Sequence, residues 1–132
     1  MNFGTKVHEA LELLDFKNPN YDLIDLDNYV VNKIKSFINS SFIKENINNK
    51  LYKEYEFTYI ENDNYMHGII DLMIEDKDKI IILDYKLKGI DDINYDKQLN
   101  GYRKVIENRT NKKIVCLLYS ILDEKFREVK EV

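Results

Sequence analysis

The chain has 132 residues, enough for one domain with its own hydrophobic core and little more. Hydrophobic residues make up 44% and charged residues 33%, a globular balance that argues against a disordered chain. The 20 basic and 24 acidic side chains give a net charge of −4, which argues against a broad basic surface for nucleic acid. A small metal-dependent phosphate site is not excluded. We therefore expect a single domain over residues 1–132.

Two features of the sequence indicate a cytoplasmic protein that does not contact membranes. No apolar run approaches the roughly 20 residues that cross a bilayer, and the N-terminus has no apolar signal-peptide segment. Cys116 is the only cysteine, which excludes an internal disulfide bond and a four-cysteine zinc or iron–sulfur site. A reducing compartment is the natural setting for such a chain.

The N-terminal third is predicted to be helical. The apolar residues of the first helix are Val7, Ala10, Leu11 and Leu14, and those of the second are Leu23, Leu26, Val30, Ile34 and Phe37. Their spacing is typical of helices with one buried face. Thr5 and Asp22 are the expected N-caps. Ser40-Ser41 is expected to interrupt the second helix, and a short third helix is expected to end near Asn48-Asn49.

From Leu51 the hydrophobic period changes to two, as in a β-strand. The residues expected to share one face of this strand are Lys53, Tyr55, Phe57 and Tyr59. Gly68–Glu75 and Ile80–Lys86 are the next two strands, and the second opens with an apolar run typical of a strand covered on both faces. The remaining elements are a helix over Tyr95–Glu107 and a closing hairpin of Ile114–Tyr119 and Phe126–Val129. The order ααα-βββ-α-ββ predicts an α/β fold, a central mixed β-sheet flanked by helices.

The most informative residues for function are two aspartates and a lysine on adjacent strands. Asp84 and Lys86 are two residues apart and share a strand face. If Lys77-Asp78 forms a two-residue hairpin loop, Asp71 lies directly opposite Asp84. Facing carboxylates repel each other, and a bound cation would remove that penalty. Oxygen ligands suit Mg²⁺ or Mn²⁺.

The alternative interpretation is structural. An Asp-x-Lys pair alone usually lies at the solvent-exposed edge of a strand and has no catalytic role. Asp71, however, lies in the otherwise apolar segment Gly68–Glu75, and a buried carboxylate without a partner is costly. The combination with Lys86 therefore favours a functional site.

Five short motifs occur in order along the chain. They are Gly4-x-x-Val7-His8, Glu54-x-x-Phe57, Gly68-x-x-Asp71, Asp84-Tyr85-Lys86 and Gln98-x-x-x-Tyr102. Together they resemble the motifs of the RecB-like branch of the PD-(D/E)xK nuclease superfamily, and within it they are most similar to the nuclease domain of AddA-type helicase–nucleases. The resemblance implies a restriction-endonuclease-like core and a metal-dependent DNA nuclease, the nuclease module of a helicase–nuclease in DNA repair or recombination.

The resemblance also implies a role for each motif residue. The metal ligands would be His8, Asp71, Asp84 and the Tyr85 backbone carbonyl, and the catalytic set would be Glu54, Asp71, Asp84 and Lys86. Lys86 would orient the attacking water and stabilise charge on the phosphoryl oxygens, and Glu54 would bind the metal through water. Spacing alone does not choose between Glu54 and Glu56, whereas the motif favours Glu54. The implied cofactor is Mg²⁺ or Mn²⁺, without an iron–sulfur cluster.

The candidate DNA contacts each have a structural alternative. Gln98 and Tyr102 are four residues apart and meet on one helix face, as a DNA contact or as a polar rim beside the core. Lys88 either contacts phosphate or is simply one more lysine of a lysine-rich chain. The implied partners are single-stranded DNA or unwound duplex, and a helicase motor in the same polypeptide or complex.

Two further functions compete with the nuclease. One is a catalytically inactive DNA-binding or scaffold module with the same fold, and the other is a structure-specific nuclease of the junction-resolvase kind. The Asp71, Asp84 and Lys86 set argues against the first, and the His8, Gln98 and Tyr102 motifs argue against the second. The sequence leaves open endonuclease or exonuclease action, its polarity and the preferred metal.

Overall fold

The computed structural model describes residues 3–131 of the chain. The N-terminal part contains helices α1 (Phe3–Leu13), α2 (Asn28–Ile38) and α3 (Ser41–Asn46), with a 3-10 turn η1 (Tyr21–Leu23) between the first two. The strands are β1 (Lys50–Glu61), β2 (Asn64–Glu75), β3 (Lys79–Lys86), β4 (Lys113–Ser120) and β5 (Lys125–Val129). Helix α4 (Ile93–Glu107) lies between β3 and β4. The predicted order of helices and strands is confirmed.

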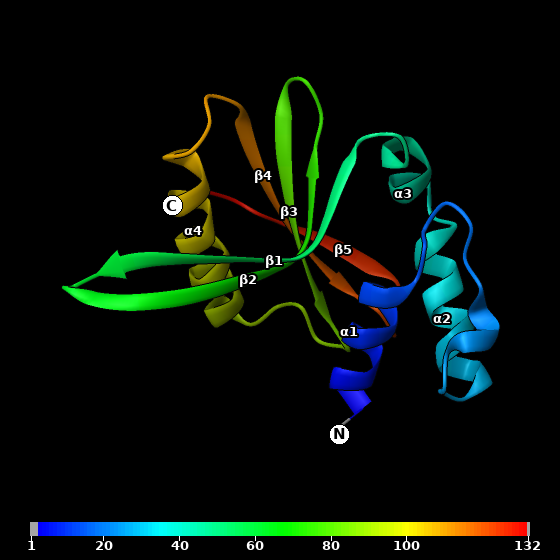
Figure 1. Cartoon of the computed structure of the whole chain (residues 1–132). Helices are drawn as coiled ribbons and strands as arrows, with labels where there is room; N and C mark the ends of the chain where they lie inside the picture. The colour runs from blue at the N-terminus through cyan, green and yellow to red at the C-terminus, as the bar shows by residue number, and fades with distance from the viewer. Residues whose placement is uncertain (1–2, 132) are drawn as a thin grey trace.

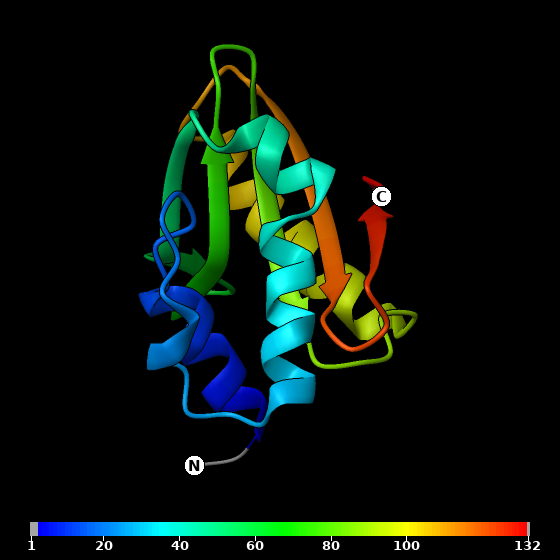
Figure 2. The same cartoon turned by 90° about the vertical axis from the view of Figure 1, so that its right-hand side faces the viewer.

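The strands form one mixed sheet in the order β1-β2-β3-β4-β5. Strands β3 and β4 are parallel, and the other neighbours are antiparallel. Helix α4 makes the crossover that a parallel pair requires. Helices α1 to α3 cover one face of the sheet and α4 covers the other (Figures 1 and 2). Within residues 3–131, no helix is long and apolar enough to cross a membrane.

Two hydrophobic cores hold these layers together. Ile34 and Phe37 of α2 pack with Leu83 on one face of the sheet, and Leu99 of α4 packs with Ile82 on the other. Strand β3 is therefore buried on both sides, as its apolar run predicts. Because hydrophobic side chains pack against both faces of β3, its C-terminal residues Asp84, Tyr85 and Lys86 are held in fixed positions.

A tight turn sets the register of β2 and β3. The Asp76 carboxylate accepts hydrogen bonds from the backbone amides of Asp78 and Lys79, at 2.7 and 2.8 Å. The Asp76 amide donates to the carbonyl of Lys79. The loop therefore has two residues, Lys77 and Asp78, as the sequence predicts, and β2 pairs with β3 in the register expected from it.

Two predicted helix caps are wrong. Thr5 lies inside α1, which extends over Phe3–Leu13. Asp22 lies in η1, where its amide donates to the side chain of Asn20. The N-cap of α2 is Asp27, whose carboxylate accepts from the Val30 amide at 3.0 Å. The helix begins where an aspartate side chain accepts from the backbone amide three residues later, as Asp27 does and Asp22 does not.

The prediction that Lys53 shares a strand face with Tyr55 and Phe57 is wrong. Lys53 donates to the Leu14 carbonyl on the side of α1 to α3, whereas Tyr55 and Phe57 pack on the side of α4. The residue between these two groups, Glu54, has a positive φ of 50°. This left-handed conformation is uncommon for a residue other than glycine, and it reverses the alternation of β1 at that point.

Strand β2 changes face at the same level. Leu72 and Ile74 pack towards α1 to α3, whereas Ile70 packs towards α4. Regular alternation would put all three side chains on one face, so the phase shifts at the residue between Ile70 and Leu72, which is Asp71. Beyond this break, β1 and β2 continue past α4 as a projecting hairpin (Figure 1).

Two arginines fix α4 against the C-terminal hairpin. Arg127 of β5 binds both carboxylate oxygens of Asp96 at 2.6 and 3.0 Å. The buried Arg103 donates to the carbonyls of Ile114 and Val129 at 2.9 and 2.7 Å. These bonds tie α4 to β4 and β5, and so determine which face of α4 meets β3.

Gly68 provides a test of the projecting hairpin. A Cβ at this position would lie 2.7 Å from Cε2 of the Phe57 ring and nearer still to Cζ. Because Phe57 is buried and packs edge-on against Tyr102, its ring cannot move aside freely. We expect Gly68→Ala to lower the free energy of unfolding by about 1–3 kcal/mol, measured by urea denaturation.

The matched control is Gly101→Ala. Gly101 lies inside α4, and a Cβ there would meet nothing within 4 Å. This change should stabilise the helix by about 0.5–1 kcal/mol. Equal effects of the two substitutions would contradict the packing of Gly68 against Phe57.

Candidate active site

Glu54, Asp71 and Asp84 lie at the same level on the neighbouring strands β1, β2 and β3. The register of β1 and β2 puts Glu54 opposite Asp71, at the position where the ladder is interrupted. The register of β2 and β3, continued by one position beyond Leu72 and Leu83, puts Asp71 opposite Asp84. The break in alternation therefore coincides with a row of three carboxylates across the sheet.

Asp71 is held by groups from two other elements. Its Oδ2 accepts a hydrogen bond of 2.8 Å from the Tyr85 amide of β3. It also lies 3.2 Å from Nε2 of His8, which α1 brings to the sheet by burying Val7 and Leu11. The hydrogen bond to Asp71 raises the pKa of His8 to about 9, so the imidazole is protonated at neutral pH. His8 and Asp71 thus form an ion pair across the layers.

Asp84 is a buried carboxylate with incomplete hydrogen bonding. Its side chain is 11% exposed, and Lys86 Nζ lies 2.9 Å from Oδ2. That ammonium lies outside hydrogen-bonding geometry, so within residues 3–131 the buried Oδ2 has no hydrogen-bond partner. Burial and then the charge of Asp71 raise the pKa of Asp84 to about 7. The site accumulates negative charge that the protein only partly neutralises.

Lys86 is held on the α4 side of the sheet by an aromatic ring. Its ammonium lies 4.1 Å from the centroid of Tyr95, the third residue of α4. A cation over a ring face is attracted electrostatically to it. Tyr95 was not predicted as a site residue, although its helical spacing with Leu99 and Tyr102 gave the signal that it faces the sheet.

The structure distinguishes the two glutamates of β1. Glu54 is half-buried, and burial and then the nearby Asp71 raise its pKa. Glu56 is exposed, and its carboxylate lies 3.7 Å from Nε2 of His67. Only Glu54 is level with the carboxylate row, which agrees with the motif that favoured it.

The predicted DNA contacts divide into two groups. Gln98 donates to the Tyr102 hydroxyl at 3.2 Å, so the two residues meet on one face of α4 as predicted. Tyr102 is near enough to Asp84 for that carboxylate to help raise its pKa, after the larger effect of burial. Lys88 is exposed in the loop after β3, and within residues 3–131 no ion pair joins it to Glu54, Asp71 or Asp84. The structure therefore brings Gln98 and Tyr102 to the site, but not Lys88.

The carboxylate row fits a hard divalent cation. Oxygen ligands suit Mg²⁺ and Mn²⁺, and Mg²⁺ is commonly bound by one or two carboxylates, with water and substrate phosphate completing the shell. Asp71 and Asp84 provide that pair, and Oδ2 of Asp84, which is ion-paired with Lys86 but within residues 3–131 accepts no hydrogen bond, is an available ligand atom. Within residues 3–131, no three His, Cys, Asp or Glu side chains are arranged to hold an ion. His8 is paired with Asp71 in this arrangement.

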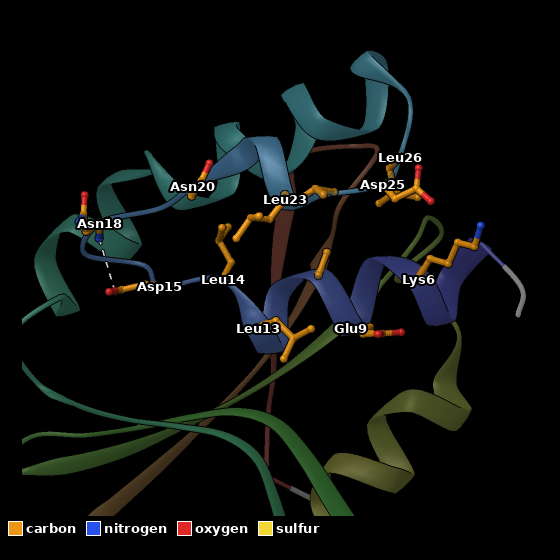
Figure 3. Close-up of a pocket in the computed structure, with 12 residues that line it drawn as sticks. Lys6, Glu9, Leu13, Leu14, Asp15, Asn18, Asn20, Leu23, Asp25 and Leu26 are labelled. Atoms are coloured by element: carbon orange, nitrogen blue, oxygen red, sulfur yellow. Dashed lines mark hydrogen bonds between the residues drawn. The ribbon is translucent and has the colours of Figure 1, made fainter.

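A separate hollow lies on the helical side of the molecule. It has a volume of about 380 Å³ and lies between α1 and the segment 18–26 (Figure 3). Leu13, Leu14 and Leu23 line it, with Glu9 and Asp15 at its rim. The carboxylate row is not part of this hollow, so the chemistry of the site depends on the strands and not on the apolar surface.

Comparison with known proteins agrees with this geometry. The sequence matches the PD-(D/E)XK nuclease superfamily over residues 1–132. The chain belongs to this superfamily. The predicted family is therefore confirmed, and the mixed sheet flanked by helices is its restriction-endonuclease-like α/β fold.

A helicase–nuclease is among the relatives of the chain. An ATP-dependent helicase/nuclease protein of Clostridium acetobutylicum is 28% identical to it over 154 residues. The matching region covers 84% of this chain and 12% of that protein. This similarity agrees with the predicted likeness to helicase–nucleases of the RecB-like branch.

The positive φ of Glu54 can be tested by comparing two truncations. Glu54→Gly and Glu54→Ala remove the same carboxylate, but only glycine adopts φ 50° without penalty. We expect the glycine variant to be more stable by about 1–2 kcal/mol. In a regular strand, alanine would instead be more stable by about 0.5–1 kcal/mol. Urea denaturation of both variants therefore gives opposite signs for a strained and a regular Glu54.

Proposed function

We propose that this chain is a Mg²⁺- or Mn²⁺-dependent deoxyribonuclease that hydrolyses phosphodiester bonds. The supporting observation is that Asp71 and Asp84 face each other across β2 and β3, with Lys86 Nζ 2.9 Å from Asp84. Two carboxylates beside a lysine provide ligands for a divalent ion and a cation for the phosphate. A structural module gains no stability from facing carboxylates.

Asp71 and Asp84 would hold the metal ion. His8 and the Tyr85 carbonyl are the further candidate ligands, and His8 would have to leave its contact with Asp71, now 3.2 Å. When bound, the ion would polarise the scissile phosphate and lower the pKa of a coordinated water. The Tyr85 amide would keep Asp71 oriented through its 2.8 Å hydrogen bond.

Lys86 and Glu54 would act on the phosphate and the water. Lys86, held over the Tyr95 ring, would donate to a phosphoryl oxygen and stabilise the charge that develops there. On substrate binding, the Lys86 ammonium would exchange its ion pair with Asp84 for one with the phosphate. Glu54 would accept a hydrogen bond from water beside Asp71.

Two substitutions separate metal binding from turnover. Asp84→Asn should remove both the stabilisation of the protein by MgCl₂ and the cleavage of labelled DNA, because it removes a metal ligand. Lys86→Ala should keep the MgCl₂ stabilisation and lose about 100-fold or more in cleavage rate, because it removes only the phosphate contact. Thermal unfolding with MgCl₂, or with KCl of equal ionic strength, measures the first effect. Single-turnover cleavage of single- and double-stranded DNA measures the second.

Two matched controls preserve the site. Asp91→Asn changes a side chain that is 95% exposed, and Lys44→Ala changes an exposed residue of α3. Both should keep the metal response and the cleavage rate. Wild-type cleavage by either site variant would contradict the assignment. A wild-type chain that binds Mg²⁺ but cuts no DNA would instead favour the inactive module, and selective cutting of four-way junctions would favour a resolvase.

The proposal extends to the biological setting of the nuclease. A net charge of −4 gives the chain little long-range attraction for DNA, and the relative in Clostridium acetobutylicum is named as a helicase/nuclease. We infer that the chain works in DNA repair or recombination, on strands delivered by a helicase motor in cis or in complex. The cytoplasmic location expected from the sequence suits that substrate.

Delivery by a motor predicts a difference between free and tethered forms. Short tethers raise the effective concentration of a substrate to the millimolar range. The isolated chain should therefore cut free DNA slowly, and a fusion to a helicase motor should gain about 100-fold or more. Single-turnover cleavage of one labelled substrate at equal salt, with and without ATP, makes the comparison. Equal rates for the free and fused forms would show that the chain needs no delivery.

A further inference from the structure

A second hollow lies beside the site, between the projecting part of β1 and α4. Its volume is about 680 Å³, and Tyr59 and Glu61 of β1 form part of one wall. Lys97, Gly101 and Lys104 of α4 form part of the other. The distal end of the β1–β2 hairpin passes α4 here, away from α1 to α3 (Figure 1). None of the motifs identified in the sequence accounts for this groove.

The charge of the groove is opposite to that of the whole chain. Lys97, Lys104 and Arg109 line it, against the single carboxylate of Glu61, whereas the chain has a net charge of −4. Lys97 and Lys104 are exposed, and within residues 3–131 no ion pair engages either ammonium. Arg109 is anchored to β1 through a hydrogen bond of 3.1 Å to the Thr58 carbonyl. The two lysines are therefore free to bind an anion.

The groove also has an open floor and an aromatic wall. Gly101 lies between Lys97 and Lys104 on the same side of α4, and a Cβ at Gly101 would meet nothing within 4 Å. Tyr59 is half-buried, with its ring centroid 5.8 Å from that of Phe57. An aromatic face beside free cations is the combination that binds an unpaired base and its backbone.

Buried aromatic rings connect the groove to the carboxylate site. The ring of Phe57 packs between Tyr59 and Tyr102, with centroid distances of 5.8 and 5.2 Å. Tyr102 follows Gly101 directly and is near enough to Asp84 to be affected by its charge. Along β1, the groove residue Thr58 is four positions, or about 13 Å, from Glu54. A strand in the groove would therefore lie beside the proposed cleavage position.

We propose that this groove binds single-stranded DNA next to the scissile phosphate, with Lys97 and Lys104 on backbone phosphates and Tyr59 stacked on a base. The inference rests on the proposed nuclease function and specifies single-stranded DNA as the form of its substrate. Stacking on Tyr59 requires an unpaired base. The few free cations of the groove suit a short single strand better than a duplex, whose binding depends on neutralising many phosphates.

The test measures binding without catalysis. The wild-type chain is titrated in EDTA against a fluorescein-labelled oligothymidine of twelve or so nucleotides, and anisotropy is recorded over a series of KCl concentrations. Each phosphate contact to a single strand contributes about 0.7 to the slope of log K against log[KCl]. Lys97→Gln/Lys104→Gln should therefore reduce the slope by about 1.4.

Two lysines on the opposite layer provide the matched control. Lys35→Gln/Lys44→Gln changes the net charge by the same amount on α2 and α3, and it should leave the salt slope unchanged. Equal changes of the salt slope in both double variants, or no change in either, would contradict the assignment of DNA binding to this groove. Urea denaturation of each variant confirms that it is folded.

Two further substitutions test the floor and the wall. Gly101→Glu places a carboxylate in open space and should abolish binding of the oligonucleotide while keeping the fold. Tyr59→Leu should weaken binding about fivefold or more, whereas Tyr65→Leu, at a hairpin residue that is 86% exposed, should not. Equal losses at Tyr59 and Tyr65 would contradict stacking in the groove.

Binding and cleavage results can be read separately. In MgCl₂, Lys97→Gln/Lys104→Gln should raise KM and leave kcat unchanged, because the groove lies outside the reacting atoms. A wild-type chain that cuts no DNA, yet shows the specific change of salt slope, would preserve the groove and overturn the nuclease. A nuclease whose slope and KM are unaffected by the groove variants would overturn the groove alone.

Discussion

The crowding of carboxylates at the break in the sheet is the constraint on which the site depends. Asp71 and Asp84 face each other, and Glu54 adjoins them on the next strand at a positive φ. Neither feature is favourable alone, because like charges repel and a left-handed glutamate is strained. The two hydrophobic cores and the Asp76 turn fix β2 and β3 in this register. Packing of the two cores and the Asp76 turn thus offset the repulsion between the carboxylates and the backbone strain at Glu54.

Opposite layers supply the cations that partly neutralise the row. His8 reaches Asp71 from α1, and Lys86, held by Tyr95 of α4, reaches Asp84. Because the strands change face at this level, groups from both sides of the sheet meet at one point. Three carboxylates against two cations leave a negative balance that suits an added divalent ion. Burial and then the charge of Asp71 raise the pKa of Asp84.

The sequence predicts the parts of this arrangement that depend on local rules. The two-residue loop at Lys77-Asp78 follows from the charged residues between two apolar strands, and the β2–β3 register follows from the loop. The reversal at Glu54 could not be predicted, because glutamate gives no signal for a positive φ and the hydrophobic pattern of β1 is compatible with regular alternation. The role of Tyr95 was missed for a related reason, since its contact with Lys86 depends on how α4 crosses the sheet.

The two charged regions meet opposite requirements of the proposed phosphodiester cleavage. A divalent ion needs a concentrated negative site, and the carboxylate row provides it at the cost of repelling DNA. The free lysines of α4 lie on the other side of Phe57 and Tyr102, so they can attract the backbone without neutralising Asp84 directly. Separating the two charges by a wall of aromatic rings keeps the lysines from forming ion pairs with the carboxylates. The proposed metal site and the proposed strand groove are thus compatible with the net charge of −4.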